Sequence, residues 1–262
     1  METLIKKELV DRAHPLAVKI RKQITQALAD YQMLNDKDKV MICVSGGKDS
    51  SILTILLDEI RKRAEIDFSF EAVILDQKQP GFFAEHFNTW LQNEGIMLRT
   101  IERDTYSIVT DKIQDKTFCS LCSKLRRAIL YDYAFDHGFT KMALGHHRDD
   151  VIETTLLNLF YTGQTSTMPA KLSSDDGRNI VLRPMVYVAE KDLIELSQIW
   201  NFPVIPCNLC GSQDGMKRKR MKKLVRELEQ EIPHLGSSFI HALQNVKPSH
   251  LLDQKLYDFN QR

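Results

Sequence analysis

The chain lacks any run of apolar residues that approaches the length needed to cross a membrane. Its first residues carry acids and hold no apolar core of signal-peptide length. The chain also lacks an excess of charge of either sign, since the formal net charge at pH 7 is only +1. These absences predict a cytoplasmic protein with no membrane partner, and they confine any nucleic-acid surface to a local patch.

Cysteine is scarce too, with five residues in the chain. Cys43 lies within an apolar run and is predicted to be a buried core residue. The others form two C-x-x-C pairs, Cys119 with Cys122 and Cys207 with Cys210. In a reducing compartment such pairs indicate metal binding rather than disulfides. The spacing allows a structural Zn²⁺ site with four thiolates, a redox pair, or a [4Fe–4S] cluster held by three or four thiolates.

A glycine loop lies between an apolar run over 40–44 and a predicted helix that begins near Asp49. The loop reads Ser45-Gly46-Gly47-Lys48-Asp49-Ser50. Glycine lets backbone approach a ligand closely, and the N–H groups at the start of a helix can hold phosphate. The spacing fits neither the common P-loop nor the dinucleotide fingerprint. A Gly-Gly turn capped by Ser and Asp is the alternative that needs no ligand.

The loop resembles the pyrophosphate loop (PP-loop) of ATP pyrophosphatases, which cleave ATP between the α and β phosphates. The resemblance implies that the six loop residues bind ATP. It also gives Asp49 a role, because a carboxylate can hold Mg²⁺ against the phosphates.

The chain alternates between predicted strands and predicted helices, which indicates a Rossmann-type α/β fold with a parallel sheet covered on both faces. Strands are expected over 40–44, 68–75, 97–101 and 141–144, and helices over 14–34, 82–94 and 151–161 and after Cys122. Residues 173–178 are predicted to form an exposed loop. We expect an N-terminal helical segment over 1–36, a nucleotide-binding domain over 37–205, and a basic, cysteine-containing helical segment over 206–262.

Two further polar segments follow predicted strands, namely Asp76 and the run Gly145-His146-His147-Arg148-Asp149-Asp150. Ligands of parallel sheets bind at the carboxyl ends of the strands. We therefore expect Asp76, Gly145 and His146 to join the nucleotide site, and Asp150 to bind Mg²⁺ or to transfer a proton. Helix capping explains one of the acids, but not two histidines and two acids together.

A more extensive resemblance covers most of the chain in order. It rests on the PP-loop and on Cys119-Ser-Leu-Cys122-Ser-Lys-Leu-Arg-Arg127, Pro206-Cys-Asn-Leu-Cys-Gly-Ser-Gln213, Ser174-Asp-Asp-Gly177 and Asn245-Val-Lys-Pro-Ser-His250. These segments resemble the TtcA family of tRNA 2-thiocytidine synthetases.

The resemblance implies ATP-dependent thiolation of cytidine 32 in the tRNA anticodon loop. It also implies a [4Fe–4S] cluster held by three cysteines, which we expect to be Cys119, Cys122 and Cys210, with Cys207 as the alternative third ligand. A cysteine desulfurase is the expected sulfur source, and a homodimer is one expected assembly. The rival interpretations are another PP-loop enzyme, such as a 2-thiouridine synthetase, and a zinc-stabilised tRNA-binding protein with a degenerate ATP site.

A basic run over 217–226 holds seven cations in ten positions. Such runs are often a solvated helix face. In a chain of net charge +1, their concentration near a proposed cluster ligand favours contact with tRNA phosphates. We expect this run to bind tRNA at a distance from the PP-loop.

Overall fold

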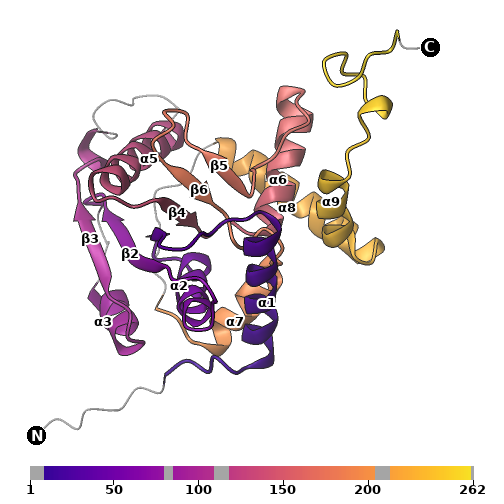
Figure 1. Ribbon diagram of the computed structural model, residues 1–262. Coiled ribbons are helices and arrows are strands. Elements are labelled where there is room, and N and C mark those ends of the chain that lie inside the picture. The colour runs from indigo at the N-terminus through magenta and orange to yellow at the C-terminus, as the bar shows by residue number, and fades with distance from the viewer. Residues whose placement is uncertain (1–8, 80–84, 109–117, 204–212, 261–262) are drawn as a thin grey trace, which may run out of the picture.

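The computed structural model describes residues 9–79, 85–108, 118–203 and 213–260 (Figure 1). Within these residues a six-stranded sheet has the order β3-β2-β1-β4-β6-β5. The strands are β1 (Lys39–Val44), β2 (Ser69–Asp76), β3 (Leu98–Glu102), β4 (Lys141–Leu144), β5 (Lys171–Ser173) and β6 (Ile180–Leu182). The predicted α/β fold and the four predicted strands are confirmed.

The sheet is parallel except at one edge. β1 pairs in parallel with β2 and β4, and β4 pairs in parallel with β6. β5 pairs antiparallel with β6 because a short hairpin joins them. The predicted parallel sheet is confirmed from β3 to β6, and β5 adds an antiparallel edge strand that was not predicted.

The turn of this hairpin is the predicted exposed loop over 173–178, where Ser173 and residues 175–178 are exposed. Ser174 is buried, and its Oγ accepts the backbone N–H of Asn179 at 3.0 Å. This bond closes the turn, so the segment is an ordered connection between two strands.

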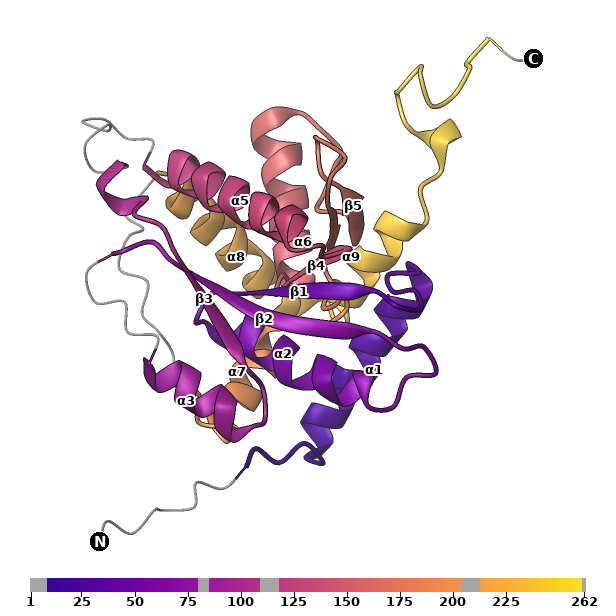
Figure 2. The ribbon, with the colours of Figure 1, turned by 60° about the vertical axis from the view of Figure 1, so that its left-hand side comes forward.

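Helices cover both faces of the sheet, as predicted. Figure 2 shows α5 (Phe118–Asp136) on one side of the strands and α2 (Lys48–Arg61) and α3 (Glu85–Asn93) on the other. Successive side chains of a strand point to opposite faces. Val40, Ile42 and Val44 of β1 accordingly join the apolar cluster that includes α2, while Met41 and Cys43 join the cluster that includes α5.

The N-terminal helix α1 (Pro15–Asp30) is part of the same core. Its Ile20 and Ile24 are fully buried in the cluster that also contains residues of α2 and of α7 (Glu190–Ile199). The division of the chain at residues 36 and 205 stays a prediction.

The helix predicted over 151–161 begins earlier and changes type. α6 spans Arg148–Leu157, and a π-helical turn, η1, follows over Asn158–Thr162. α8 (Gln213–Glu231) and α9 (Leu235–Gln244) pack against α6. Beyond α9, the chain extends away from the sheet, with a 3₁₀ turn, η2, over Pro248–His250 (Figure 1).

The helix expected after Cys122 begins at Phe118. Cys119 and Cys122 therefore lie in the first turns of α5, not in a loop before it. Among the described residues, no helix combines the length and the apolar character that a membrane span requires.

Candidate functional site

The glycine loop joins the carboxyl end of β1 to the start of α2. Gly46 has φ of 78°, a conformation that favours glycine. Ser50 Oγ accepts the backbone N–H of Ser45 at 3.1 Å and donates to the carbonyl of Gly47 at 3.2 Å. Gly47 is the N-cap of α2 and makes no side-chain capping bond, so the first N–H groups of this helix remain able to hold an anion.

Gly145 brings the β4–α6 connection against this loop. A Cβ at Gly145 would lie 2.8 Å from the backbone nitrogen of Ser50 and 3.0 Å from its Cα. Only a residue without a side chain permits this approach. The connection therefore forms one wall beside the start of α2.

Lys48 and Asp49 open α2 with opposite charges. Lys48 Nζ lies 3.0 Å from Asp49 Oδ1 and 3.9 Å from Oε1 of Glu190, the first residue of α7. Burial raises the pKa of Glu190, but the hydrogen bond with Lys222 of α8 and the charges of Lys222 and Lys48 together outweigh burial and hold the pKa below its usual range. Glu190 thus stays ionised between a loop lysine and a lysine of α8.

The start of α6 supplies the second group of polar side chains. Asp150 Oδ2 accepts the backbone N–H of His147 at 3.0 Å, which caps α6. Asp149 instead accepts the N–H of Glu190 at 2.7 Å and so connects α6 to α7. Burial lowers the pKa of His146 to about 4, so its imidazole is neutral at pH 7, and its Nδ1 makes no hydrogen bond within the described residues.

Glu153, one turn into α6, is a polar group that was not among the expected site residues. It is 4% exposed, and burial together with the charge of Asp150 raises its pKa to about 7. Arg218 of α8 reaches both acids, with nitrogen–oxygen distances of 3.8 Å to Asp150 and 3.8 Å to Glu153. The two carboxylates and the guanidinium form one electrostatic unit.

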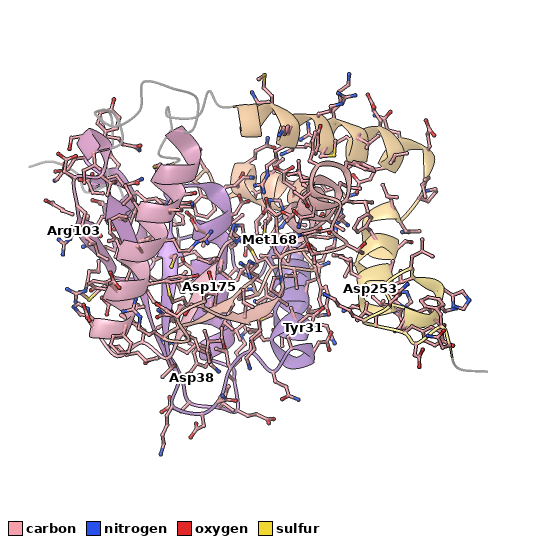
Figure 3. The ribbon with its side chains drawn as sticks, turned by 90° about the horizontal axis from the view of Figure 1, so that it is seen from above. Tyr31, Asp38, Arg103, Met168, Asp175 and Asp253 are labelled. Atoms are coloured by element: carbon pink, nitrogen blue, oxygen red, sulfur yellow. The ribbon has the colours of Figure 1, made fainter. Side chains whose placement is uncertain are left out.

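A cavity of about 510 Å³ joins these groups to α5 and to the β5–β6 hairpin. Of the residues expected at the nucleotide site, those that line it are Ser45, Asp49, Ser50, Gly145, His146 and Asp150. α5 adds Ser123, Arg126, Arg127 and Tyr131, and the hairpin region adds Asp175 and Arg183. Figure 3 shows Asp175 beside α5.

The other expected nucleotide ligands lie outside this cavity. Gly46, Gly47 and Lys48 belong to the glycine loop but do not line the cavity. Asp76 stands at the carboxyl end of β2, where Oδ1 accepts the N–H of Lys78 at 2.7 Å and Oδ2 lies 3.4 Å from Lys78 Nζ. The structure brings Asp49 and Asp150 to one cavity and leaves Asp76 apart from it.

The expected cluster ligands are described only in part. Cys122 is half-buried, and its Sγ lies 3.4 Å from Oε1 of Gln77. Cys207 and Cys210 lie outside the described residues, as does the side chain of Cys119. Because Ser123 lines the cavity, the cavity reaches the residue next to Cys122.

Arg183 is a cavity residue that sequence reasoning missed. Its Nη1 donates to the carbonyl of Pro169 at 2.6 Å, while its buried Nε makes no hydrogen bond within the described residues. Burial lowers the pKa of this guanidinium from its ordinary value. Nothing in its sequence context showed that Arg183 lines the same cavity as Asp49 and Asp150.

The basic run occupies two faces of α8. Arg218, Lys222 and Arg226 face α6 and α7, where Lys222 Nζ lies 2.5 Å from Glu190 Oε1 and Arg226 lies 3.7 Å from Oε2. Lys219 and Arg220 are exposed. The expectation that the whole run lies far from the PP-loop is therefore wrong, since Lys48 and Lys222 share Glu190.

Comparisons with known proteins agree with this geometry. The PP-loop domain family matches residues 16–203. A tRNA-cytidine(32) 2-sulfurtransferase from Bdellovibrio bacteriovorus is 62% identical over 253 residues, which is 97% of this chain and 98% of the relative. A protein of the same name from Hahella chejuensis is 51% identical over 242 residues, 92% of this chain and 85% of the relative.

A solved structure shares the fold at low identity. It is the U34-tRNA thiolase NcsA from Methanococcus maripaludis with its [4Fe–4S] cluster, with a TM-score of 0.69 and 19% identity over 89% of this chain and 80% of that one. The PP-loop match and the long, highly identical relatives together show that the chain belongs to the tRNA-cytidine(32) 2-sulfurtransferase family of PP-loop proteins.

Proposed function

We propose that the protein uses ATP to replace the C2 oxygen of cytidine 32 in the tRNA anticodon loop by sulfur. One observation carries the proposal: the cavity that Asp49 and Asp150 line is also lined by Ser123, the residue next to Cys122 in α5. A nucleotide-activation site and a sulfur site beside one cavity fit a single substrate base between them.

The residues present fit ATP. The uncapped N-terminus of α2 and the positive φ of Gly46 make a cradle for the pyrophosphate, with Ser45 and Ser50 beside it. Gly145 and the neutral His146 form the opposite wall, where an uncharged ring suits an adenosine better than an imidazolium would. Lys48 and Asp76 complete the proposed set of nucleotide ligands.

We assign Mg²⁺ to Asp49 and Asp150. Within the described residues, no group of three or more His, Cys, Asp or Glu side chains could hold a metal ion by itself. This agrees with Mg²⁺ chemistry, since that ion is commonly held by one or two carboxylates together with substrate phosphates and water.

We assign the cluster to Cys119, Cys122 and one of the second pair, with Cys210 preferred over Cys207. Three thiolates on a [4Fe–4S] cluster would leave one iron open to bind the incoming sulfur.

The chain's own residues have roles in each step. The C2 oxygen attacks the α phosphorus of ATP, an oxygen–phosphorus bond forms, and the bond to the pyrophosphate breaks. The N–H groups of α2 hold the negative charge that the leaving pyrophosphate carries. Hydrosulfide then adds to C2 and forms the carbon–sulfur bond, its proton is released, and the C2–oxygen bond breaks as AMP leaves with the former C2 oxygen. Asp150 is placed to take a proton in the second step if it does not hold Mg²⁺.

The partners follow from this chemistry. The substrate is tRNA, and the sulfur comes from cysteine through a desulfurase. We place the reaction in the cytoplasm, where tRNA is available. A homodimer is a further proposal, which sedimentation of the purified protein tests.

The test is nucleoside analysis of tRNA from a strain without the gene, complemented by wild type, Asp49→Asn, Asp150→Asn or Asp149→Asn. We expect 2-thiocytidine only with wild type and Asp149→Asn. Asparagine at position 150 can still accept the His147 N–H, so the cap survives while the charge is lost. Asp149→Asn is the matched control, because that carboxylate faces α7. 2-Thiocytidine at wild-type level with Asp49→Asn or Asp150→Asn would remove that residue from the catalytic set.

The same strain separates the rival functions. Loss of 2-thiouridine with normal 2-thiocytidine would identify a different tRNA thiolase. Unchanged tRNA, together with colourless protein that contains zinc after anaerobic purification, would identify a zinc-stabilised RNA-binding protein.

A further inference from the structure

Two aromatic rings stand exposed on the π-helical turn η1. Phe160 is 57% exposed and Tyr161 is 45% exposed. The turn is well braced: Thr162 Oγ1 donates to the carbonyl of Asn158 at 2.8 Å, and Asn158 Nδ2 donates to the carbonyl of Ser166 at 3.1 Å. The rings are therefore presented by an ordered turn, and single π-helical turns are frequent at functional sites.

A hollow of about 610 Å³ lies between these rings and α8. Its floor is apolar, formed by the buried Met221 and the half-buried Leu224. Its rim is basic, formed by Arg220 and Lys223.

Further charges complete this rim. Lys217 Nζ sits 5.0 Å from the centre of the Tyr161 ring. Glu227, the one acid among the residues that line the hollow, lies 3.7 Å from Lys223. The hollow therefore combines exposed rings with excess positive charge.

This combination fits one class of partner. A base of single-stranded nucleic acid stacks on an aromatic ring, and its flanking phosphates pair with lysine and arginine. A protein partner fits less well, because lysine is depleted in protein interfaces. The outer cations of the basic run, which the catalytic residues do not use, thereby acquire a partner.

We propose that Phe160 and Tyr161 stack on unpaired bases of the RNA substrate, and that Lys217, Arg220 and Lys223 hold the adjoining phosphates. The identity of that RNA as tRNA rests on the proposed function. α6 carries Asp150 in its first turn and leads into η1, and its 10 residues span about 15 Å. The stacked bases are thus neighbours of the reacting cytidine in the anticodon loop.

The first test measures binding of a fluorescein-labelled anticodon stem–loop RNA and of a blunt duplex of equal length. We expect Phe160→Leu and Tyr161→Leu, which keep apolar bulk but remove the ring, each to weaken stem–loop binding by about 5- to 100-fold. Duplex binding should not change, and Tyr161→Phe should bind like wild type. Phe135→Leu is the matched control, since Phe135 is 53% exposed and lies 5.3 Å from Arg178, but on α5.

The second test concerns charge. Lys217→Gln, Arg220→Gln and Lys223→Gln should each lower the salt slope of stem–loop binding by about 0.7. Lys62→Gln, at the far end of α2 from the PP-loop, should leave the slope unchanged.

Three results would overturn the proposal. The first is a double variant, Phe160→Leu/Tyr161→Leu, that binds the stem–loop as tightly as the wild-type enzyme does, when the wild-type enzyme forms 2-thiocytidine. Another is an equal loss on stem–loop and duplex, which would mean that the rings support the fold rather than stack. The third is unchanged RNA affinity with a shift from dimer to monomer in sedimentation, which would make this face a protein interface. If wild type binds the stem–loop through the rings yet never thiolates it, the proposed function fails and this inference stands.

Discussion

At the scale of single residues, close packing at Gly145 controls the position of the phosphate cradle. The backbone of Ser50 lies within 2.8 Å of the place that a Cβ would occupy. Because the opposing atoms are backbone, relief requires α2 or the β4–α6 connection to move. The residue thus links the shape of the cradle to the stability of the fold.

Gly145→Ala is expected to lower the free energy of unfolding by about 1–3 kcal/mol, because overpacking forces backbone shifts. Gly47→Ala is the matched control for stability, since a Cβ there would meet only Ser45 Oγ at 3.4 Å. Urea unfolding of both variants without ATP gives the comparison. Equal stability of the two would show that the connection moves aside at no cost.

Glu153 gives the fold a pH dependence. Its pKa is raised from 4.5 to about 7 in the folded protein, first by burial and then by Asp150. The folded state therefore binds this proton more tightly than the unfolded state, and stability falls as pH rises from about 4.5 to about 7.

Glu153→Gln should remove this loss. Without Mg²⁺, we expect it to raise the free energy of unfolding at pH 8 by on the order of 2 kcal/mol, with little effect at pH 4.5. Thermal unfolding across pH, with Asp175→Asn as a cavity-lining control, measures the difference. Parallel pH profiles for wild type and Glu153→Gln would show that Glu153 stays ionised in the fold.

At the scale of elements, α8 separates two kinds of basic residue by helical periodicity. Residues four apart share a face, so Arg218 and Lys222 both face the acids of α6 and α7. Lys219 is exposed on a different face. The basic run, which is uniform in sequence, therefore places its cations on two different faces of α8.

Arg218→Gln and Lys219→Gln make the same charge change at adjacent positions. We expect Arg218→Gln to slow single-turnover thiolation at saturating tRNA by about tenfold or more, because Asp150 and Glu153 lose their shared cation and repel each other (about 1.4 kcal/mol per tenfold). Lys219→Gln should change only the affinity for tRNA and its salt dependence. Equal rates at saturating tRNA would assign both cations to RNA binding alone.

At the scale of the whole molecule, the cavity joins segments far apart in sequence. The PP-loop follows β1, the acids begin α6, and the cysteine-bearing turn begins α5. The β5–β6 hairpin encloses the same space through Asp175. Activation and sulfur transfer can then take place without release of the base.

The cluster assignment is tested by four alanine variants. After anaerobic purification, we expect three variants to lack the broad visible absorbance of the wild-type protein, namely Cys119→Ala, Cys122→Ala and Cys210→Ala. Each should also lack bound iron and thiolation activity. Cys207→Ala should keep a partial or complete cluster. The reverse pattern for Cys207 and Cys210 would exchange the third ligand, and zinc in place of iron in wild type would exclude the cluster.

Much of the local structure could be predicted without the fold. The apolar runs and the glycine pair predicted β1 and α2, and the alternation of strand and helix patterns predicted a parallel sheet around them. Such elements depend on neighbouring residues and on burial, which the hydrophobic pattern of a sequence records. The motif-level resemblance likewise pointed to the family that the comparisons show.

Which groups share the cavity depends on tertiary packing. Asp76 ends a strand and Asp150 follows one, yet Asp76 binds Lys78 while Asp150 lines the same cavity as Asp49. Arg218 of α8 forms an ion pair with Glu153 of α6, and η1 and α8 line one hollow. Both arrangements result from packing between helices, which sequence spacing does not encode. Contacts of this kind depend on how elements distant in the chain fit together in three dimensions, so they emerge only when the whole fold is assembled.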